Sequence, residues 1–376
     1  MKFRSERDML VEAFVTAGRA ATGRGPGMAA LGGIRMDLQG NNLQVVGTDL
    51  DLTVKVEIEA VGLDDGACVA PARLSTDIVR SLEPGAVTVE ASENEVEISA
   101  GRSRFVVRTY PVDDFPLAVG SEARAVELSA HGLAEALRQV VRAASGDDAR
   151  PLLTGVLMAV EGEGVRFVAT DSYRLAMRDL ATASPLPPGT DQILVPARAL
   201  GELLRLLPSK EPQKDAPTSE TTVGFSVGDH DATFKVAGVT ISTRLLDGKF
   251  PDYRQLIPPG YPNHLKVSKE ALLDALRRVR LLVRDNTTPV RLSMHTGGVE
   301  LTVVSQEVGH ASEDLDADYE GEEHSVAFNP SYLIDGVEAV VGEEIVLEAL
   351  DSGKPATVRG PDHEDYRYLL MPVRVS

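Results

Sequence analysis

The feature that most constrains the fold of this chain is an internal repeat. Three kinds of segment recur in one order: a helix-like stretch with apolar residues at positions i, i+3, i+4 and i+7, a strand–turn–strand stretch, and an extended tripeptide that leads into a second, shorter helix. Asp171 repeats the position of Asp49 after 122 residues, and Pro196 repeats that of Pro71 after 125 residues. A period of this length is the size of a whole domain. The sequence therefore predicts three copies of one α+β domain, each with two helices packed on antiparallel sheet.

Local signals support the predicted helices. Ser129 and Ser268 stand where a helix N-cap is wanted. Pro71 and Pro196 suit the entry from a strand into a helix, because the missing N–H does no harm there. The predicted first helices are residues 5–20, 129–144 and 268–284, the predicted second helices are residues 72–82, 197–207 and 330–340, and the strand–turn–strand stretches are Leu43–Val54, Val165–Met177 and Val299–Ser312.

Breaks rich in Gly and Pro divide the copies. Leu117–Arg124 and Ile257–Asn263 are such breaks, whereas Ser209–Glu220 is a polar loop inside the second copy. Each copy closes with alternating strands that run towards a Pro-containing segment. We expect domains at residues 1–121, 122–261 and 262–376.

Composition places the chain among multidomain globular proteins. With 376 residues, 43% hydrophobic and 25% charged, it can bury more than one core. Met1–Leu10 mixes charges of both signs, and no apolar run approaches the roughly 20 residues that a membrane span needs. The single cysteine, Cys68, excludes an intramolecular disulfide and a thiolate metal cluster, and is expected to be a small core residue. These features predict a cytoplasmic protein.

Charge is distributed unevenly along the chain. The formal net charge of −19 argues, taken alone, against binding to nucleic acid. The six predicted helices, however, carry 13 basic against 10 acidic residues, while the rest of the chain carries 25 against 47. If the helices share one surface, that surface is basic on an acidic body and can accept a polyanion. The alternative is that amphipathic helices simply carry solvated arginines.

Motifs for catalysis and metal binding are missing from the sequence. There is no G-x-x-x-x-G-K-[ST] loop, and the seven histidines form neither an H-x-H nor an H-E-x-x-H pattern. Asp314–Asp318 starts like a calcium loop, but Tyr319 and Ser325 stand where Gly and Glu are needed, so we expect an acidic strand. Ser172 has no partner histidine and fits a turn hydroxyl. We expect no catalytic residue, no metal and no cofactor.

Five segments, in one order from end to end, resemble the bacterial DNA polymerase III beta subunit, the beta sliding clamp. The resemblance implies three similar domains per chain and two chains joined head to tail, as a ring of six domains with helices inside and sheet outside. Such a ring encircles duplex DNA and tethers the replicative polymerase without bond chemistry. The segments are Gly101–Pro116, Val168–Met177, Lys249–Pro258, Phe328–Val340 and Tyr368–Val375.

The resemblance also implies a DNA-facing surface. Arg24 lies in the Gly-rich loop Thr22–Met28, where the family has a DNA-facing arginine. The family's second DNA loop corresponds to Asp148–Thr154; here Pro151 and Leu152 replace tyrosines of some members, which leaves Arg150 as a phosphate contact. The remaining candidates are Arg73, Arg138, Arg142, Arg198, Arg205, Arg277 and Arg278.

A pocket for partner peptides is implied between the second and third domains. A few apolar side chains of a short peptide would anchor there, and Met371 is adaptable enough to serve several partners, among them the polymerase III alpha subunit and the clamp loader. Ser172 and Tyr173 replace a Gly-His pair of some members, so partner preference can differ. The other pocket candidates are Leu153, Thr170, Arg174, Leu175, Pro251, Gln255, Leu256, Asn329, Tyr332, Leu369, Leu370, Pro372 and Arg374.

Closure of a homodimeric ring is expected from a head-to-tail contact. Phe105 and Val107, on an edge strand of the first domain, should meet Leu281 and Leu282 of the third; the simpler alternative is that all four complete their own cores. Two other classes of protein stay open. One is a diverged clamp paralogue with altered partners or inhibitor sensitivity, and the other is an unrelated acidic β-rich binding module or hydrolase.

Overall fold

A computed structural model of the chain describes most of its length. The described residues are 1–23, 28–116, 125–182, 186–187, 190–208, 221–284 and 288–374. Arg24, the expected break at 117–124 and the expected polar loop at 209–220 lie outside them. No helix in these ranges is long and apolar enough to cross a membrane.

The predicted threefold repeat is confirmed by the order of elements. Each copy runs strand, helix, three strands, one further strand, helix and three strands, with an extra short strand in the first and third copies. The first copy holds β1 (Lys2–Glu6), α1 (Arg7–Gly18), β2 (Gly33–Gln39), β3 (Asn42–Thr48), β4 (Leu52–Glu59), β5 (Val61–Asp64), β6 (Gly66–Pro71), α2 (Ala72–Ser81), β7 (Ala86–Ala91), β8 (Glu95–Ala100) and β9 (Ser103–Arg108).

The other two copies follow the same order. The second holds β10 (Val126–Ser129), α3 (Ala130–Val140), β11 (Gly155–Glu161), β12 (Gly164–Thr170), β13 (Arg174–Ala181), β14 (Gln192–Pro196), α4 (Ala197–Leu206), β15 (Thr222–Val227), β16 (Asp231–Val236) and β17 (Val239–Arg244). The third holds β18 (Asn263–Ser268), α5 (Lys269–Val279), β19 (Val290–His295), β20 (Gly298–Ser305), β21 (Gly309–Asp316), β22 (Asp318–Glu320), β23 (His324–Phe328), α6 (Pro330–Ala339), β24 (Glu344–Ala349), β25 (Ala356–Gly360) and β26 (His363–Leu370).

Short 3-10 helices complete the copies. They are η1 (Ala29–Gly32) and η2 (Val112–Asp114) in the first copy, η3 (Val141–Ala143), η4 (Pro151–Thr154) and η5 (Tyr253–Leu256) between β10 and β18, and η6 (Arg280–Leu282) after α5.

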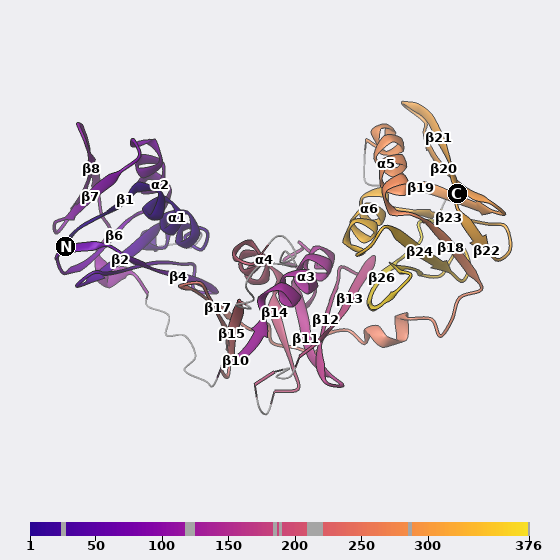
Figure 1. The fold of residues 1–376 in the computed structure, drawn as a ribbon, viewed down its shortest axis with the longest axis horizontal. Coiled ribbons are helices and arrows are strands. Elements are labelled where there is room, and N and C mark those ends of the chain that lie inside the picture. The colour runs from indigo at the N-terminus through magenta and orange to yellow at the C-terminus, as the bar shows by residue number, and fades with distance from the viewer. Residues whose placement is uncertain are drawn as a thin grey trace, which may run out of the picture. The chain divides into compact units, whose positions relative to one another are not determined.

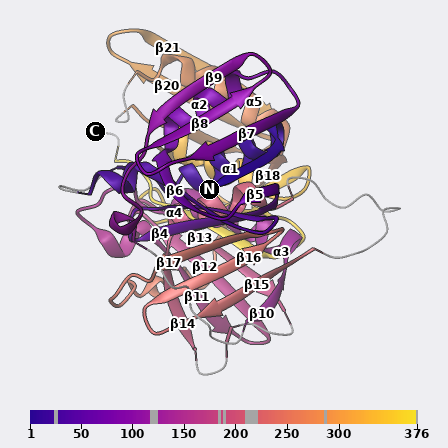
Figure 2. The same ribbon diagram turned by 90° about the vertical axis from the view of Figure 1, so that its left-hand side faces the viewer.

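Two antiparallel sheets are built in the same way in every copy. The first strand pairs with the last three, as in β10-β15-β16-β17, and the three middle strands pair with the strand before the second helix, as in β4-β3-β2-β6. Sheets of neighbouring copies then join edge to edge. β4 pairs antiparallel with β17, and Val54 lies opposite Ile241. β13 pairs antiparallel with β26, and Ala176 lies opposite Tyr368. The joined sheets have eight and nine strands (Figures 1 and 2).

Because sheets run from one copy into the next, the chain forms two compact units although it repeats three times. The first unit contains residues 1–130 and the strands β15 to β17; the second contains α3, β11 to β14, most of α4 and the chain from residue 246 onward. Within the first unit α1 packs on α2, and within the second α5 packs on α6 (Figure 1).

The predicted helices are confirmed to within a few residues. Ser268 caps α5 by accepting a hydrogen bond at Oγ from the backbone N of Ala271 at 3.4 Å. The first helix was placed too early, because Ser5 and Glu6 belong to β1 and Ser5 is buried under the sheet. The strand that opens each copy was missed, since four to six residues are too few for a clear alternating pattern.

Core positions agree with the sequence pattern. Cys68 is 2% exposed on β6, and its burial raises the pKa of the thiol to about 12, so it is a neutral core residue as expected. The acidic run Asp314–Asp318 lies in β21 and β22, which confirms the expected strand. No group of three or more His, Cys, Asp or Glu among the described residues could hold a metal ion.

Candidate functional site

A tight turn between β12 and β13 forms one wall of the candidate peptide site. Asp171 Oδ1 accepts hydrogen bonds from the backbone N of Tyr173 and of Arg174, each at 2.9 Å. Thr170 Oγ1 accepts from Ser172 N at 3.1 Å and donates to Arg174 O at 2.6 Å. These bonds hold Ser172 at φ +80°, and the turn presents Tyr173, whose side chain is 59% exposed, to solvent.

Arg174 is held inside this wall. Its side chain is only 11% exposed; Nε donates to Asp171 Oδ2 at 3.0 Å and Nη1 donates to Asp335 Oδ2 at 2.5 Å. The guanidinium carbon lies 4.3 Å from the centroid of the Tyr332 ring, a cation–π contact. Burial acts to lower the pKa of Arg174, but nearby Tyr368 and the two carboxylates raise it by more, so the side chain stays charged.

The first turn of α6 forms the adjoining part of the site. Asn329 caps the helix, because its Oδ1 accepts from Ser331 N at 2.9 Å and Tyr332 N at 3.3 Å. Tyr368 of β26 donates from its hydroxyl to Tyr332 O at 2.9 Å. The position of the Tyr332 ring is therefore set by a helix cap and by a strand of the same unit.

The floor beside the turn is apolar. Leu175 and Leu369 face one side of the joined β13–β26 sheet and are 2% and 3% exposed. They pack with the aromatic rings of Phe250 and Tyr253, and partly buried Leu152 lies against the same cluster. These side chains form a buried apolar cluster that supports the turn and η5 from behind.

Exposed apolar side chains lie at the end of β26 and on η5. Met371 N donates to Tyr173 O at 2.9 Å, so the chain after β26 runs beside the turn. Met371 is 40% exposed and Leu256 is 47% exposed. Pro251, Gln255 and Arg374 are also exposed, and Pro372 and Asn329 are half-buried.

The structure brings the predicted pocket residues together but divides them by burial. Leu153 and Thr170 are buried behind the exposed side chains at 8% and 5% exposure. Leu370 needs a correction. It is 1% exposed and, by the alternation of β26, points to the opposite face from Leu369, so its side chain offers no surface to a peptide.

Arg150, the expected phosphate contact of the second DNA loop, lies beside the turn that bears Tyr173. Its Nη1 donates to Asp171 O at 3.2 Å and to Ser172 Oγ at 3.3 Å, and its Nε donates to Asp147 Oδ2 at 3.0 Å. The side chain is still 42% exposed, so a phosphate contact stays a prediction.

Candidate DNA contacts lie on the helices and differ in exposure. Arg73 on α2 is 98% exposed, and Arg277 and Arg278 on α5 are 55% and 56% exposed. Arg142 on η3 is one-third exposed and lies near Asp335 and Glu338. Arg198 and Arg205 are exposed, and Arg138 is half-buried. Guanidinium groups on helix surfaces can contact phosphates without reading base sequence.

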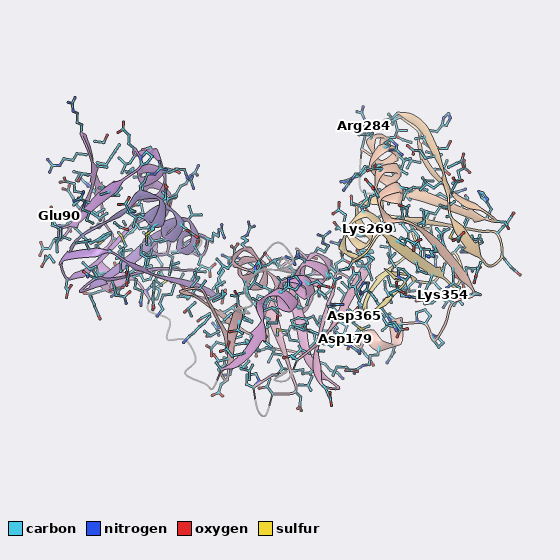
Figure 3. All side chains as sticks on the ribbon, viewed as in Figure 1. Glu90, Asp179, Lys269, Arg284, Lys354 and Asp365 are labelled. Carbon is cyan, nitrogen blue, oxygen red and sulfur yellow. The ribbon has the colours of Figure 1, made fainter. Side chains whose placement is uncertain are left out.

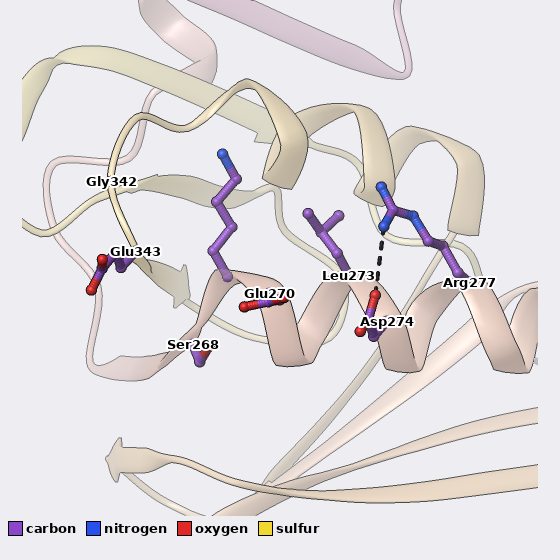
Figure 4. A pocket seen from close by; sticks show the side chains of 8 residues that line it. Ser268, Glu270, Leu273, Asp274, Arg277, Gly342 and Glu343 are labelled. Carbon is purple, nitrogen blue, oxygen red and sulfur yellow. Dashed lines mark ion pairs between the residues drawn. The ribbon is translucent and has the colours of Figure 1, made fainter.

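A polar hollow of about 500 Å³ lies beside α5. Figure 4 shows it between α5 and the loop at Gly342 and Glu343, with the ion pair of Arg277 and Asp274 at 3.5 Å on its border. Basic and acidic side chains line it together. It therefore lacks the excess of donors that an anion site would need.

The candidate interface residues lie on edge strand β9 and on η6, which contacts edge strand β21. β9 ends the five-stranded sheet and β21 ends the four-stranded sheet. Phe105 on β9 is 37% exposed, and Leu281, which follows α5 on η6, is 82% exposed, with half-buried Leu282 after it. The prediction that Val107 meets a second chain needs a correction. Val107 is 8% exposed and packs into its own domain, whereas its neighbour Val106 is 53% exposed.

Several residues of the site were not singled out from sequence. Asp171 shapes the turn, Asp335 binds Arg174, and Phe250 and Tyr253 build the floor. The sequence marked Asp171 only as the repeat of Asp49, and in the structure Asp49 Oδ1 accepts from Asp51 N and Leu52 N in the corresponding turn of the first copy. A carboxylate at the same repeat position indicates a turn that both copies need.

Three α+β copies joined edge to edge, with exposed apolar side chains such as Met371 beside one junction and arginines on the helices, define the sliding-clamp class of protein. Family models agree along the chain. Those of the DNA polymerase III beta subunit match with its N-terminal domain at residues 1–119, its central domain at 127–252 and its C-terminal domain at 254–374.

Known proteins give the same result. The beta sliding clamp of Streptomyces coelicolor is 33% identical over 382 residues, covering 100% of both chains. The beta sliding clamp homolog GriR of Streptomyces muensis is 30% identical over 100% of this chain and 99% of its own. The crystal structure of the DNA polymerase sliding clamp of Bacillus subtilis superposes with a TM-score of 0.90 at 28% identity, covering 100% of both chains. The chain belongs to the DNA polymerase III beta subunit family, the beta sliding clamps, and its function is that of a sliding clamp.

Proposed function

We propose that two copies of this chain join head to tail into a closed ring around duplex DNA, and that the ring tethers the polymerase III alpha subunit, the clamp loader and other proteins through the groove at Tyr173 and Met371. In this role the protein performs no bond chemistry and binds no cofactor. The chain would contribute domains at 1–121, 122–261 and 262–376. It would work in the cytoplasm, where the chromosome of a bacterium lies.

The observation that carries this proposal is the pairing rule at the two junctions within the chain. At each junction the third middle strand of one copy pairs with the last strand of the next: β4 with β17, and β13 with β26. Applied once more, the rule leaves β21 of the third copy and β9 of the first, which are both edge strands. Heterologous contacts of this kind close when a second chain supplies the complementary edges.

Charge and apolar surface at these two edges complement each other. β9 carries exposed Arg104 and Arg108, whereas β21 carries Asp314 and Asp316, also exposed. Like charges on both edges would oppose pairing, so the opposite signs favour the head-to-tail contact over a contact of identical edges. Exposed Leu281 lies next to β21 and would meet Phe105 of the second chain.

The helix arginines support the DNA part of the proposal. Arg73, Arg138, Arg142, Arg198, Arg205, Arg277 and Arg278 are spread over four helices or the turns that follow them, so that each copy contributes to the basic surface. Acidic residues prevail elsewhere, which limits phosphate contact to that surface. Scattered, partly neutralised arginines hold a duplex weakly and without preferred sequence, as sliding requires.

The test asks whether the protein is held on DNA because it encircles the duplex or because it binds the duplex through direct contacts. The protein is loaded on nicked circular DNA with a clamp loader, isolated by gel filtration, and the circle is then cut with a restriction enzyme. We expect retention on the intact circle and loss after linearisation, because a ring slides off free ends. Equal retention on both forms would show binding by contacts alone and would exclude the ring.

A groove variant separates the two parts of the function. Met371→Ala removes an exposed apolar side chain, so we expect it to weaken binding of a peptide from the polymerase III alpha subunit by about tenfold while the dimer persists. Loss of the dimer would place Met371 in the interface. If the wild-type ring stays on circular DNA but does not bind this peptide, the protein would instead be a diverged clamp with altered partners. Ser172 and Tyr173, which replace a Gly-His pair of some family members, favour that alternative.

A further inference from the structure

Helix α6 receives side chains from both helices that pack near its C-terminal end. Gln139 of α3, 2% exposed, donates from Nε2 to Ala339 O at 2.9 Å. Lys269 lies at the start of α5 (Figure 3). Its Nζ donates to Glu338 O at 3.1 Å and to Val340 O at 2.5 Å. These bonds satisfy carbonyl groups that the helix end leaves open. A shift in the position of α6 would therefore alter its hydrogen bonds with α3 and α5.

Along the side of α6, acidic and basic side chains alternate without a gap. Asp335 Oδ2 lies 2.5 Å from Arg174 Nη1, and Asp335 Oδ1 lies 3.6 Å from Arg142 Nη1. Arg142 Nη1 lies 3.4 Å from Glu338 Oε2, and Glu338 Oε1 lies 3.0 Å from Arg277 Nη2. One end of this series is Arg174 under the Tyr332 ring, and the other is the exposed arginine of α5.

Asp335 is the residue at which a nearby charge can change the strength of two ion pairs in this series. Its single carboxylate is shared by two guanidinium groups, and it is one-third exposed, so both ion pairs respond to nearby charge. A phosphate that binds Arg142 would draw its positive charge away from Asp335. The carboxylate would then hold Arg174 more strongly in the position that supports Tyr332.

We propose that Asp335 is a positioning residue that couples the peptide groove to the basic helix surface, so that duplex DNA on the helices raises the affinity of the groove for a partner peptide. The proposal rests on the proposed function for both surfaces. A ring on DNA would then recruit partners better than a free ring. Because coupling between two ligands is reciprocal, the peptide must raise the affinity for DNA by the same factor.

The test measures peptide affinity with and without DNA. A fluorescent peptide from the polymerase III alpha subunit is titrated with the dimer by anisotropy at low ionic strength, alone and with a saturating 20-base-pair duplex. For the wild type we expect the duplex to lower the Kd of the peptide by about fivefold. No change, or a rise in the Kd, would overturn the coupling.

Three variants assign the effect to Asp335. Asp335→Asn should weaken the peptide alone by about fivefold and bring the effect of the duplex to none, because Arg174 loses a charged partner. Arg142→Ala removes the guanidinium that competes for Asp335, so without DNA it should bind the peptide about as tightly as the wild type does with the duplex, and the duplex should add nothing. Arg359→Ala breaks an ion pair of 2.8 Å with Glu348 in the same domain, outside the series, and should behave as the wild type.

The outcomes separate this inference from the proposed function. If the wild type binds no peptide, the proposed groove is wrong. If it binds the peptide and the duplex has no effect, only the coupling is wrong. An effect that survives in both Asp335→Asn and Arg142→Ala would also overturn the role of Asp335, since the coupling would then travel by another route.

Discussion

At the scale of single residues, Ser172 holds a backbone conformation that side chains rarely adopt. Its φ is +80°, and Leu50 at the corresponding turn of the first copy has φ +81°. In both turns an aspartate Oδ1 accepts two backbone N–H groups and a threonine Oγ1 accepts a third. The turn's hydrogen bonds thus impose a conformation that favours glycine, and the strain lies beside exposed Tyr173.

Relief of this strain should stabilise the protein. For Ser172→Gly we expect the free energy of unfolding to rise by about 0.5–1 kcal/mol, because the relieved strain exceeds the entropy that glycine adds to the unfolded chain. Thermal denaturation followed by circular dichroism checks it. Ser172→Ala keeps the Cβ atom and should give no gain; a gain of equal size in both variants would mean that the loss of the hydroxyl, not of strain, is responsible.

At the scale of elements, α6 links stability to binding. It bears Tyr332 and Asp335 on neighbouring turns and begins at a capped Asn329. Helices α3, α5 and strand β26 all bond to it. Its position therefore depends on both the second and the third copies, and so does the position of the Tyr332 ring.

Loss of the α6 cap should affect both properties. Asn329→Ala leaves Ser331 N and Tyr332 N without their acceptor, so we expect a loss of about 1 kcal/mol in unfolding free energy and weaker binding of the alpha-subunit peptide. Urea denaturation and anisotropy measure the two. The matched control is Ser268→Ala, which removes the longer cap bond of α5 and should cost less stability with peptide affinity unchanged. Equal loss of peptide affinity in both variants would contradict a local role of the α6 cap.

At the scale of the whole molecule, the edges left over by the pairing rule govern assembly. Each junction inside the chain uses one strand type from each copy, and the third pair of such strands, β9 and β21, is not joined within the described chain. Leu281 beside β21 is 82% exposed, so its side chain is available to a second chain at this edge.

Charge at this position should open the ring. Leu281→Asp is expected to shift the protein from dimer to monomer, because it buries a carboxylate in the contact, while the unfolding free energy of the domain changes by less than about 0.5 kcal/mol. Multi-angle light scattering at micromolar concentration gives the mass. Leu63→Asp, which alters a leucine 58% exposed on β5, should remain dimeric. A monomeric wild type, or a dimeric Leu281→Asp, would rule out this interface.

The sequence determined much of the fold, because the helices and strands follow from local patterns of apolar residues and these patterns recur in three copies. The spacing of apolar residues, Pro71 and Pro196 at helix entries and the cap at Ser268 placed the six helices correctly to within a few residues. Cys68 as a core residue and the acidic run as strands follow from the same local patterns. The resemblance to the sliding clamps then predicted which residues gather around Tyr173 and Met371.

Only the tertiary structure decided which side chains face outward and which meet. Val107 and Leu370 turned inward, and Arg150 joined the Tyr173 turn, because the direction of a strand residue depends on which sheet it enters. Asp335 lies 161 residues from Arg174, and no local pattern pairs them. Contacts between distant segments arise when sheets of neighbouring copies join, and this is why the charged network and the free edges became visible only in the fold.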